Sequence, residues 1–294
     1  MNLAIFGRKL KSEHVSFVET LFSELSIQPH KCLYIFKDYY ETLKDKVQIK
    51  NPFFLFSSYE ELKKLNIDFC ITLGGDGTIL EAVTYIRDTA IPILGINLGR
   101  LGFLAMFEKK RIAESIVALD TNCYATESRT LLQLESSDHI FGELNFALND
   151  FTLLKRDTSS MVIIHTYVNG EFLNSYWADG IIVATPTGST GYSLSCGGPV
   201  IFPKSSNFII TPVAPHNLNV RPIVLSDDVV ISFEIQGRTT NYLCTLDSRY
   251  QTIKASTQLA IRKCPFVVHI LRPNDRNFLY TIREKLHWGI DSRN

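Results

Sequence analysis

Residues 69–81 read FCITLGGDGTILE: an apolar run, a glycine-rich turn that holds one aspartate, and the beginning of a helical pattern. Gly74 and Gly75 precede Asp76, and Gly77 follows it. Because glycine has no side chain, it allows a ligand to approach the backbone closely. The stretch therefore predicts a strand, a turn and a helix, with something large approaching a single carboxylate.

Residues 1–120 alternate such apolar runs with helical patterns. Strands are expected at residues 3–7, 69–73 and 91–97, and helices at residues 12–25, 78–88 and 109–120. Ser12 is expected to cap the first helix, since a serine oxygen can accept a backbone N–H there. Strands that alternate with helices pair in parallel through crossovers, which predicts an α/β sheet. Ligands of such sheets collect beyond the carboxyl ends of the strands.

The pattern changes at about residue 125. Apolar and polar residues then alternate, and Val, Ile, Thr, Tyr and Phe are frequent, as is typical of strands. Asn169-Gly170 between two such runs predicts a tight hairpin. The second half is therefore expected to be antiparallel β. A helical pattern at residues 277–289 is expected to pack back on the first domain. The expected boundaries are 1–124 for the α/β domain, 125–270 for the β-rich domain and 271–294 for the tail.

Composition argues against several classes of protein, although it leaves room for a local basic patch. Among the 294 residues, 30 Lys and Arg balance 30 Asp and Glu, which gives no electrostatic reason to expect nucleic acid or a membrane as a partner. No apolar run approaches the roughly 20 residues of a transmembrane helix. The six cysteines are scattered, without a C-x-x-C pair or the spacing of a zinc site. Buried thiols in a reducing cytoplasm are therefore expected.

The glycine turn matches neither common nucleotide-binding pattern. The chain lacks G-x-x-x-x-G-K-[ST], and residues 95–103 space their glycines as G-x-x-x-G-x-x-G. Amides that enter a helix can still bind phosphate. A carboxylate beside phosphates is understandable if Asp76 holds a divalent cation or accepts a proton from an attacking hydroxyl. The alternative is that Asp76 only caps a helix entered at Thr78.

A second segment, residues 179–201, reads DGIIVATPTGSTGYSLSCGGPVI and is dense in Gly, Ser and Thr. Small hydroxyls and bare backbone suit the recognition of ribose and phosphate. The ring of Tyr192 can stack on a base. A flexible surface loop is the alternative, but apolar residues bound the segment on both sides.

Taken together, six motifs resemble the NAD kinase family. In chain order they are GGDGT (74–78), LGINLGRLGFL (94–104), Asn149-Asp150, DGIIVATPTGSTGYSLSCGGP (179–199), TPVAPHNLNVRPIVL (211–225) and KLHWG (285–289). The resemblance covers nearly the whole chain. GGDGT alone is shared in similar form with lipid kinases and phosphofructokinases, so a lipid kinase is the alternative interpretation.

The resemblance implies a Rossmann-like α/β domain, a β-sandwich domain and a C-terminal helix that returns to the first. It implies transfer of the terminal phosphate of ATP, or of polyphosphate in some members, to the adenosine-ribose 2′-hydroxyl of NAD, giving NADP. A divalent cation, most often Mg²⁺, assists, and members are usually homodimers or homotetramers. Asp76 then corresponds to the base that accepts the hydroxyl's proton. The phosphate-donor loop comprises Gly74, Gly75, Gly77 and Thr78.

The resemblance also implies a set of residues that bind NAD. They are Asp76, Gly77, Asn149, Asp150, Asp179, Thr190, Gly191, Tyr192, Ser193, Leu194, Ser195 and Ala214. The Asn149-Asp150 pair can read adenine and a ribose diol, and Asp179 matches an aspartate near the nicotinamide end. Without the resemblance, a simple turn at Asn149-Asp150 is the preferred interpretation.

Some positions depart from the family or carry no assigned role. Trp177 stands where many members have a basic residue, and Arg249 where some have glutamine. His216 and Arg221 are expected to be structural. Arg100 is a candidate for a phosphate contact, without a defined role.

Overall fold

A computed structural model describes residues 1–27, 31–156, 161–237 and 241–289. The chain forms two compact units. Unit 1 comprises Met1–Ser128 with Val268–Asn294, of which residues 290–294 of the expected tail lie outside the described part, and unit 2 comprises Arg129–Val267. Each unit is described by itself.

A parallel sheet forms the centre of unit 1, with strand order β5-β4-β1-β2-β3. The bounds are β1 (Asn2–Gly7), β2 (Cys32–Phe36), β3 (Phe53–Phe56), β4 (Phe69–Leu73) and β5 (Ile93–Asn97). Two further segments pair with β5 in parallel, namely β6 (Phe107–Glu108) and the end of β18 (Leu259–Pro273). The expected strand at residues 69–73 is confirmed as β4.

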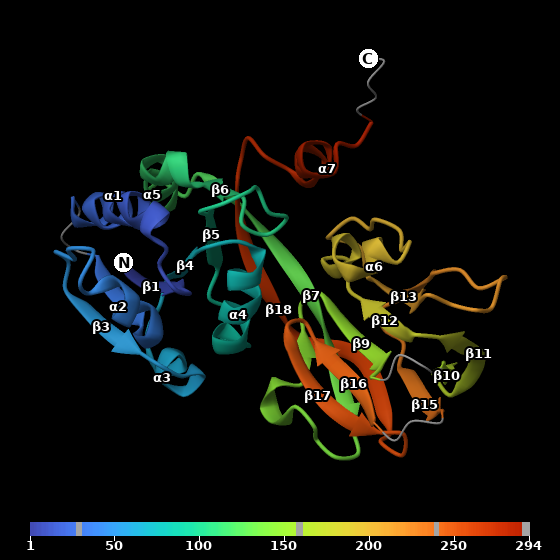
Figure 1. Cartoon of the computed structure of the whole chain (residues 1–294). Helices are drawn as coiled ribbons and strands as arrows, with labels where there is room; N and C mark the ends of the chain where they lie inside the picture. The colour runs from blue at the N-terminus through green and yellow to red at the C-terminus, as the bar shows by residue number, and fades with distance from the viewer. Residues whose placement is uncertain (28–30, 157–160, 238–240, 290–294) are drawn as a thin grey trace. The chain divides into compact units, whose positions relative to one another are not determined.

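Helices cover this sheet on both sides (Figure 1). The bounds are α1 (Val15–Ser26), α2 (Lys37–Leu43), α3 (Tyr59–Lys64), α4 (Asp76–Ile86), α5 (Ile112–Asp120) and α7 (Phe278–Leu286). α1 contacts α5, and α3 contacts α4. In α1 the buried residues are Val18, Leu21, Phe22 and Leu25, an i, i+3, i+4, i+7 stripe turned to the core.

Three expected helix starts differ from the structure. The helix expected at residues 109–120 begins at Ile112, after a 3-10 turn at Lys109–Arg111. Ser12 belongs to a short 3-10 turn, Ser12–His14, and α1 begins after it, so Ser12 does not cap α1. The third difference concerns α4, which begins at Asp76 rather than at Thr78. Its N-cap is Gly75, which has no side chain to offer. The interpretation of Asp76 as a cap for a helix entered at Thr78 is therefore wrong.

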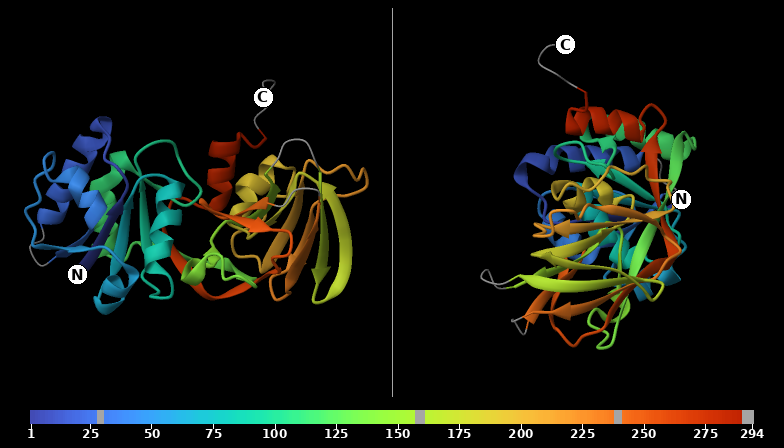
Figure 2. Two further views of the ribbon diagram at one scale, coloured as in Figure 1. Left: turned by 60° about the horizontal axis from the view of Figure 1, so that its bottom comes forward. Right: turned by 90° about the vertical axis from the view of Figure 1, so that its right-hand side faces the viewer.

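Unit 2 is built from two facing antiparallel sheets (Figure 2). One has the order β14-β13-β12-β9-β16-β17 and the other contains β11-β10-β15 beside β18, with β7 and β8. The bounds are β7 (Tyr124–Ser136), β8 (Phe146–Ala147), β9 (Asp150–Lys155), β10 (Val162–Val168), β11 (Glu171–Ala178), β12 (Gly180–Ala184), β13 (Asn207–Val213), β14 (Ile223–Ser226), β15 (Ile231–Gln236), β16 (Asn241–Leu246) and β17 (Arg249–Lys254).

Apolar side chains from both sheets share one core. The ring of Phe151 on β9 stacks on that of Phe233 on β15, with centroids 5.6 Å apart. Asn169 and Gly170 join β10 to β11 with φ values of 52° and 83°, the left-handed conformation of a tight hairpin. The expected fold class, an α/β part, an antiparallel β-sandwich and a C-terminal helix, is confirmed. No helix in the described part of the chain is both long and apolar enough to span a membrane.

Candidate active site

Three loops of unit 1 meet where β1, β4 and β5 end. These strands are neighbours and parallel, so their carboxyl ends lie at one edge of the sheet. A cavity of about 290 Å³ lies at this edge. Its walls are the glycine turn after β4, the residues after β5, and a basic stretch after β1.

Basic side chains line part of the cavity. The lining includes Arg8, Lys9, Lys11, His14 and Arg100. The guanidinium of Arg8 donates to the carbonyl of Gly77 at 3.1 Å and pairs with Glu81, so it lies across the first turn of α4. Burial lowers the pKa of His14, and the nearby Lys109 and Lys11 lower it further, although Glu13 raises it. The cavity thus offers lysine and arginine charges beside a helix N-terminus, a combination that attracts phosphate.

The basic stretch was not among the predicted site residues. Its signal was present, because residues 8–11 read RKLK directly after the expected strand at residues 3–7. A cationic run at the carboxyl end of a parallel strand lies where ligands of α/β sheets bind. Arg100, for which no role could be assigned, lines the same cavity from the loop after β5.

The Asp76 carboxylate is held by three consecutive backbone amides of another loop. Its Oδ2 accepts from Phe103 N at 2.8 Å, and its Oδ1 accepts from Leu104 N and Ala105 N, each at 3.0 Å. Lys285 Nζ lies 3.5 Å from Oδ2. Four groups therefore fix the orientation of this carboxylate, whose side chain is 26% exposed.

The glycines around Asp76 serve different purposes. At Gly74, a Cβ atom would lie 2.1 Å from Thr78 Oγ1, so this glycine is required by packing within the protein. A Cβ on Gly75 would meet no protein atom within 4 Å, whereas one on Gly77 would lie 3.6 Å from Arg8 Nη1. Among these three glycines, Gly75 is therefore the one whose side-chain position is open space.

A further glycine, Gly102, allows the carboxylate to reach its amides. A Cβ atom there would lie 1.9 Å from Asp76 Oδ1. Sequence reasoning noted the glycines of residues 95–103 but could not assign them this contact, because it joins loops that follow different strands.

In unit 2, Asn149 and Asp150 lie where a bend after β8 enters β9. The backbone amides of Leu148, Asn149 and Asp150 donate to the Asp247 carboxylate at 3.0, 2.8 and 3.2 Å. From the other side, the Thr185 amide donates to the carbonyl of Asn149 at 2.9 Å and its hydroxyl to that of Leu148 at 2.5 Å. The bend is thus fixed by two separate segments. Asp247 was not predicted as a site residue.

The side chain of Asp150 is buried, at 7% exposure. Burial raises its pKa to about 7, and the negative charge of Asp247 adds to the increase. Burial likewise raises the pKa of Asp247, while its amide donors and Arg249 oppose that rise. A carboxyl group with a pKa near neutrality can change its charge under physiological conditions.

The predicted dinucleotide-binding run faces this bend. A Cβ atom on Gly188 would lie 2.0 Å from the Asn149 carbonyl oxygen, and one on Gly191 would lie 3.8 Å from Asp150 Oδ2. The structure thus brings the run and the Asn149-Asp150 pair together. Within the run, Ser193 is buried and Tyr192 is 40% exposed, whereas Thr190, Leu194 and Ser195 are partly buried or exposed.

Asp179 is fixed between strands of unit 2. Its carboxylate pairs with Lys155 Nζ at 2.5 Å, and its amide donates to the Val213 carbonyl at 2.9 Å. Ala214, the next residue after β13, is exposed and has a φ of 45°. Lys155, like Asp247, was not predicted as a site residue of unit 2.

The departures from the family pattern have structural contacts. Arg249 donates to the carbonyls of Leu144 and Phe146, and its guanidinium lies over the Phe146 ring. It therefore stabilises the segment that precedes the bend at Asn149. The amide of His216 donates to the Trp177 carbonyl at 2.7 Å. The guanidinium of Arg221 donates to the carbonyls of Leu218 and Val220 in its own turn. The His216 contact is made by its backbone, so the role of its side chain stays a prediction.

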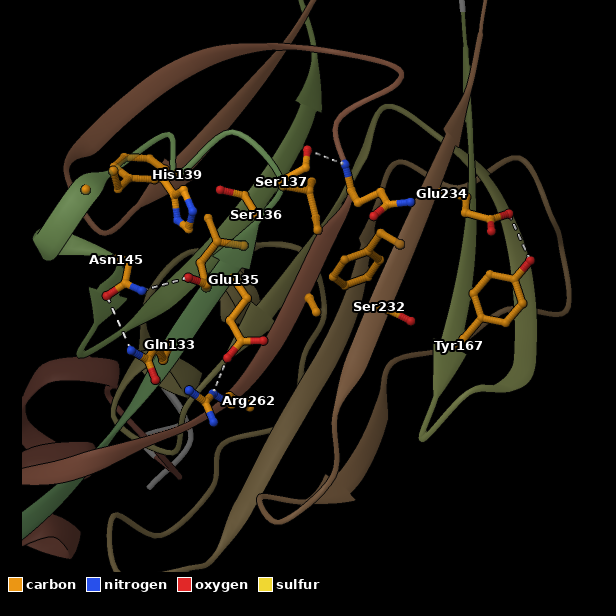
Figure 3. Close-up of a pocket in the computed structure, with 17 residues that line it drawn as sticks. Gln133, Glu135, Ser136, Ser137, His139, Asn145, Tyr167, Ser232, Glu234 and Arg262 are labelled. Carbon is orange, nitrogen blue, oxygen red and sulfur yellow. Dashed lines mark hydrogen bonds and ion pairs between the residues drawn. The ribbon is translucent and has the colours of Figure 1, made fainter.

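A larger cavity in unit 2, of about 700 Å³, contains none of the predicted site residues (Figure 3). Its charged side chains are paired with neighbours in its own wall. Arg262 pairs with Glu135 at 2.7 Å, and Tyr167 donates to Glu234 at 3.0 Å. Because these polar groups already have partners, the cavity is a weaker candidate for chemistry than the basic cavity of unit 1.

Within the described residues, no three His, Cys, Asp or Glu side chains are grouped so that they can hold a metal ion. Magnesium in kinases is often bound by one or two carboxylates together with substrate phosphates. The donor set present here therefore fits a cation that arrives with a phosphate ligand better than one held by the protein alone.

Comparison with known proteins identifies the family. The chain is 46% identical to the NAD kinase of Cytophaga hutchinsonii and 44% identical to that of Flavobacterium psychrophilum, over 100% of each chain. The chain belongs to the NAD kinase family. The family model for the ATP-NAD kinase N-terminal domain matches residues 9–122, and that for the C-terminal domain matches residues 148–272.

Solved structures of the family share the fold. Yeast NADH kinase complexed with NADH has a TM-score of 0.89 at 22% identity, covering 99% of this chain and 88% of its own. An NAD kinase from Archaeoglobus fulgidus in complex with ATP has a TM-score of 0.70 at 26% identity, covering 93% and 94%. Membership makes the chain a phosphotransferase, and the alternative of a lipid kinase is not favoured.

Proposed function

We propose that the protein transfers the terminal phosphate of ATP to the 2′-hydroxyl of the adenosine ribose of NAD, giving ADP and NADP. The observation that carries this proposal is the Asp76 carboxylate, held by three backbone amides next to an open glycine and a basic cavity. Family membership supports the class of reaction, and the geometry supports the residues that we assign to it.

The basic cavity of unit 1 is the proposed site for the donor phosphates. Arg8, Lys9, Lys11 and Arg100 supply positive charge, and the N-terminus of α4 supplies backbone amides. Gly75 lets the phosphate chain approach the backbone, because no protein atom occupies that side. Phosphoryl transfer passes through a loose transition state, so positioning and charge neutralisation provide most of the acceleration.

Asp76 is the proposed acceptor of the proton. As the ribose oxygen forms its bond to phosphorus and the bond to the ADP oxygen breaks, the hydroxyl proton passes to the carboxylate. Both carboxylate oxygens are already held by backbone amides, so the group does not need to reorient when substrate arrives.

Recognition of NAD is assigned to residues of unit 2. Asn149 offers an amide for adenine, and Asp150 offers a carboxylate for two ribose hydroxyls. The half-exposed ring of Tyr192 offers a stacking surface for a base. Asp179, already paired with Lys155, is assigned to the nicotinamide end. The remaining members of the predicted set, from Thr190 to Ser195 with Ala214, complete the proposed surface.

Three finer features belong to the proposal. Mg²⁺ bound to the donor phosphates would neutralise part of their charge. A reducing cytoplasm suits the six free cysteines, of which Cys70, Cys244 and Cys264 are buried. A homodimer or homotetramer is expected, as is usual in the family, and polyphosphate is proposed as a second donor.

Steady-state kinetics test the function directly. Purified protein is incubated with ATP, GTP or polyphosphate and with NAD, NADH or a diacylglycerol, and NADP, NADPH and phospholipid are quantified. NADP formation from ATP and NAD is the expected result. Phosphorylation of the diacylglycerol without formation of NADP or NADPH would contradict the proposal, and the same data determine the breadth of donor and acceptor.

A further inference from the structure

One face of the C-terminal helix α7 packs against the loop of unit 1 that contains Phe103. The N-cap of α7 is Asn277, whose side chain accepts from Tyr280 N at 2.9 Å. Phe278, Thr281 and Ile282 are buried, and the Phe278 ring lies 6.1 Å from that of Phe103 between centroids. α7 therefore packs against the same loop whose amides hold Asp76.

Lys285 continues this face by one more turn. It lies seven residues after Phe278, and residues at i and i+7 share one side of a helix. Its Nζ is 4.7 Å from the centroid of the Phe103 ring and 3.5 Å from Asp76 Oδ2. The lysine thus contacts both the carboxylate and the residue whose amide donates to that carboxylate.

The four contacts divide unequally between the two carboxylate oxygens. Oδ1 accepts from two backbone amides, whereas Oδ2 has one amide, that of Phe103, together with the Lys285 ammonium. The amides belong to buried backbone, while the lysine side chain is 36% exposed. Lys285 is therefore the contact on Oδ2 that can yield to an incoming hydroxyl.

From this arrangement we infer that Lys285 is a positioning residue for Asp76. Its charge holds Oδ2 in place until the substrate hydroxyl takes up that position, and its stem over Phe103 links the carboxylate to α7. The KLHWG motif, which begins at Lys285, thereby gains a role in the reaction. The inference rests on the proposed function of Asp76.

The test compares variants of the full chain in assays of NADP formation. Lys285→Met and Lys285→Gln are expected to lower kcat about tenfold, within the range of coupling between contacting residues, and to leave the KM values for NAD and ATP within about threefold. Lys285→Arg is expected to restore most of the rate. Arg283→Met, which removes an exposed cation from the same helix, is the matched control and is expected to keep the wild-type kcat.

A double-mutant cycle distinguishes positioning from a general structural effect. In an Asp76→Asn background, Lys285→Met should cause no further loss of kcat, because the carboxylate on which it acts is gone. The melting temperatures of Lys285→Met and Arg283→Met should agree. A full additional loss in the double variant, or a kcat of Lys285→Met within twofold of wild type, overturns the inference. Absence of NADP formation by the wild type instead contradicts the proposed function.

Discussion

Two aspartates in this molecule, Asp76 and Asp247, accept hydrogen bonds from three consecutive backbone amides. The donors to Asp76 are residues 103–105 in unit 1, and the donors to Asp247 are residues 148–150 in unit 2. In unit 1 the donors are buried apolar residues and the aspartate is the candidate for chemistry. In unit 2 the donors include Asn149 and Asp150, the candidates for NAD binding, and Asp247 only holds their backbone in place.

The same arrangement, a carboxylate bound by three consecutive backbone amides, therefore serves opposite purposes in the two units. A carboxylate that binds three amides fixes both partners, and which partner is functional depends on what else surrounds it. Asp76 has an open glycine and a lysine as neighbours. Asp247 instead lies next to a second carboxyl group, Asp150, whose pKa is raised by burial and further by the charge of Asp247. Substitutions at the aspartate and near the amides of each arrangement distinguish a role in the reaction from a role in stability.

The largest expected effect follows from Asp76→Asn. An amide cannot accept the proton, so turnover should fall by about a thousandfold while the dissociation constant for NAD changes by no more than a few-fold. Steady-state kinetics and calorimetric titration with NAD measure the two quantities. Near wild-type turnover would remove Asp76 from its proposed role.

The corresponding change in unit 2 should act on stability. Asp247→Ala leaves the amides of residues 148–150 without their acceptor, which is expected to lower the free energy of unfolding by about 3 kcal/mol. Urea denaturation measures it. Asp228→Ala, at an exposed aspartate of the same unit, is the control and should change stability by less than about 0.5 kcal/mol. Equal losses in both variants would show that the amides do not depend on Asp247.

A side chain at residue 102 should displace the Asp76 carboxylate from its amide donors without removing it. In Gly102→Ala the new Cβ would lie 1.9 Å from Asp76 Oδ1, so the carboxylate must move. Misplacement of a reacting group by about 1 Å can cost about 100-fold, and a loss of turnover between about 10-fold and 100-fold is expected.

Gly99→Ala is the matched control for Gly102→Ala. Its Cβ would make only an ordinary contact, 3.8 Å from Asn97 Oδ1, and its effect is expected in the KM for ATP rather than in turnover. If both variants lose turnover to the same extent, the loop as a whole, and not the Asp76 contact, tolerates no side chain.

A pH dependence that is spread over several pH units is expected from Asp150. Its pKa is about 7 in the folded protein, above the ordinary value of 3.8, so the folded state binds the proton more tightly. The free energy of unfolding should therefore fall as pH rises from about 4 to about 7, by at most about 1.4 kcal/mol per pH unit. NAD affinity should change in the opposite sense, because ribose hydroxyls donate to the ionised carboxylate.

Titrations with NAD at several pH values check this expectation. Affinity should weaken by at most about tenfold per pH unit below pH 7 in the wild type. Asp150→Asn has no titrating group at this position and should show a flat profile over the same range. An unchanged profile in this variant would assign the pH dependence to another group.

Local patterns in the sequence predicted much of the fold. The apolar run at residues 69–73, the helical stripe of α1 and the Asn169-Gly170 hairpin all appear as expected, because each depends on neighbours within a few residues. The segment containing β2, α2, β3 and α3 was not anticipated.

The hydrogen bonds that hold the candidate site residues in place could not be predicted from local patterns. The bonds from residues 103–105 to Asp76 span 27 to 29 positions, and those to Asp247 span 97 to 99. Their donors are backbone amides, which every residue except proline carries. Residue type therefore gives no signal for them, whereas Asp76 itself was identifiable from its glycines.

The division of unit 1 between residues 1–128 and the segment after Val268 has a consequence for biosynthesis. The glycine turn leaves the ribosome before the whole of unit 2, β18 and α7 are made. At about 5 to 20 residues per second, translation of the residues between the glycine turn and Lys285 takes roughly 10 to 40 seconds. During that interval the nascent sheet lacks the β18 partner of β5, and Asp76 lacks Lys285. The ion pair between Lys285 and the Asp76 carboxylate is therefore among the last contacts to form.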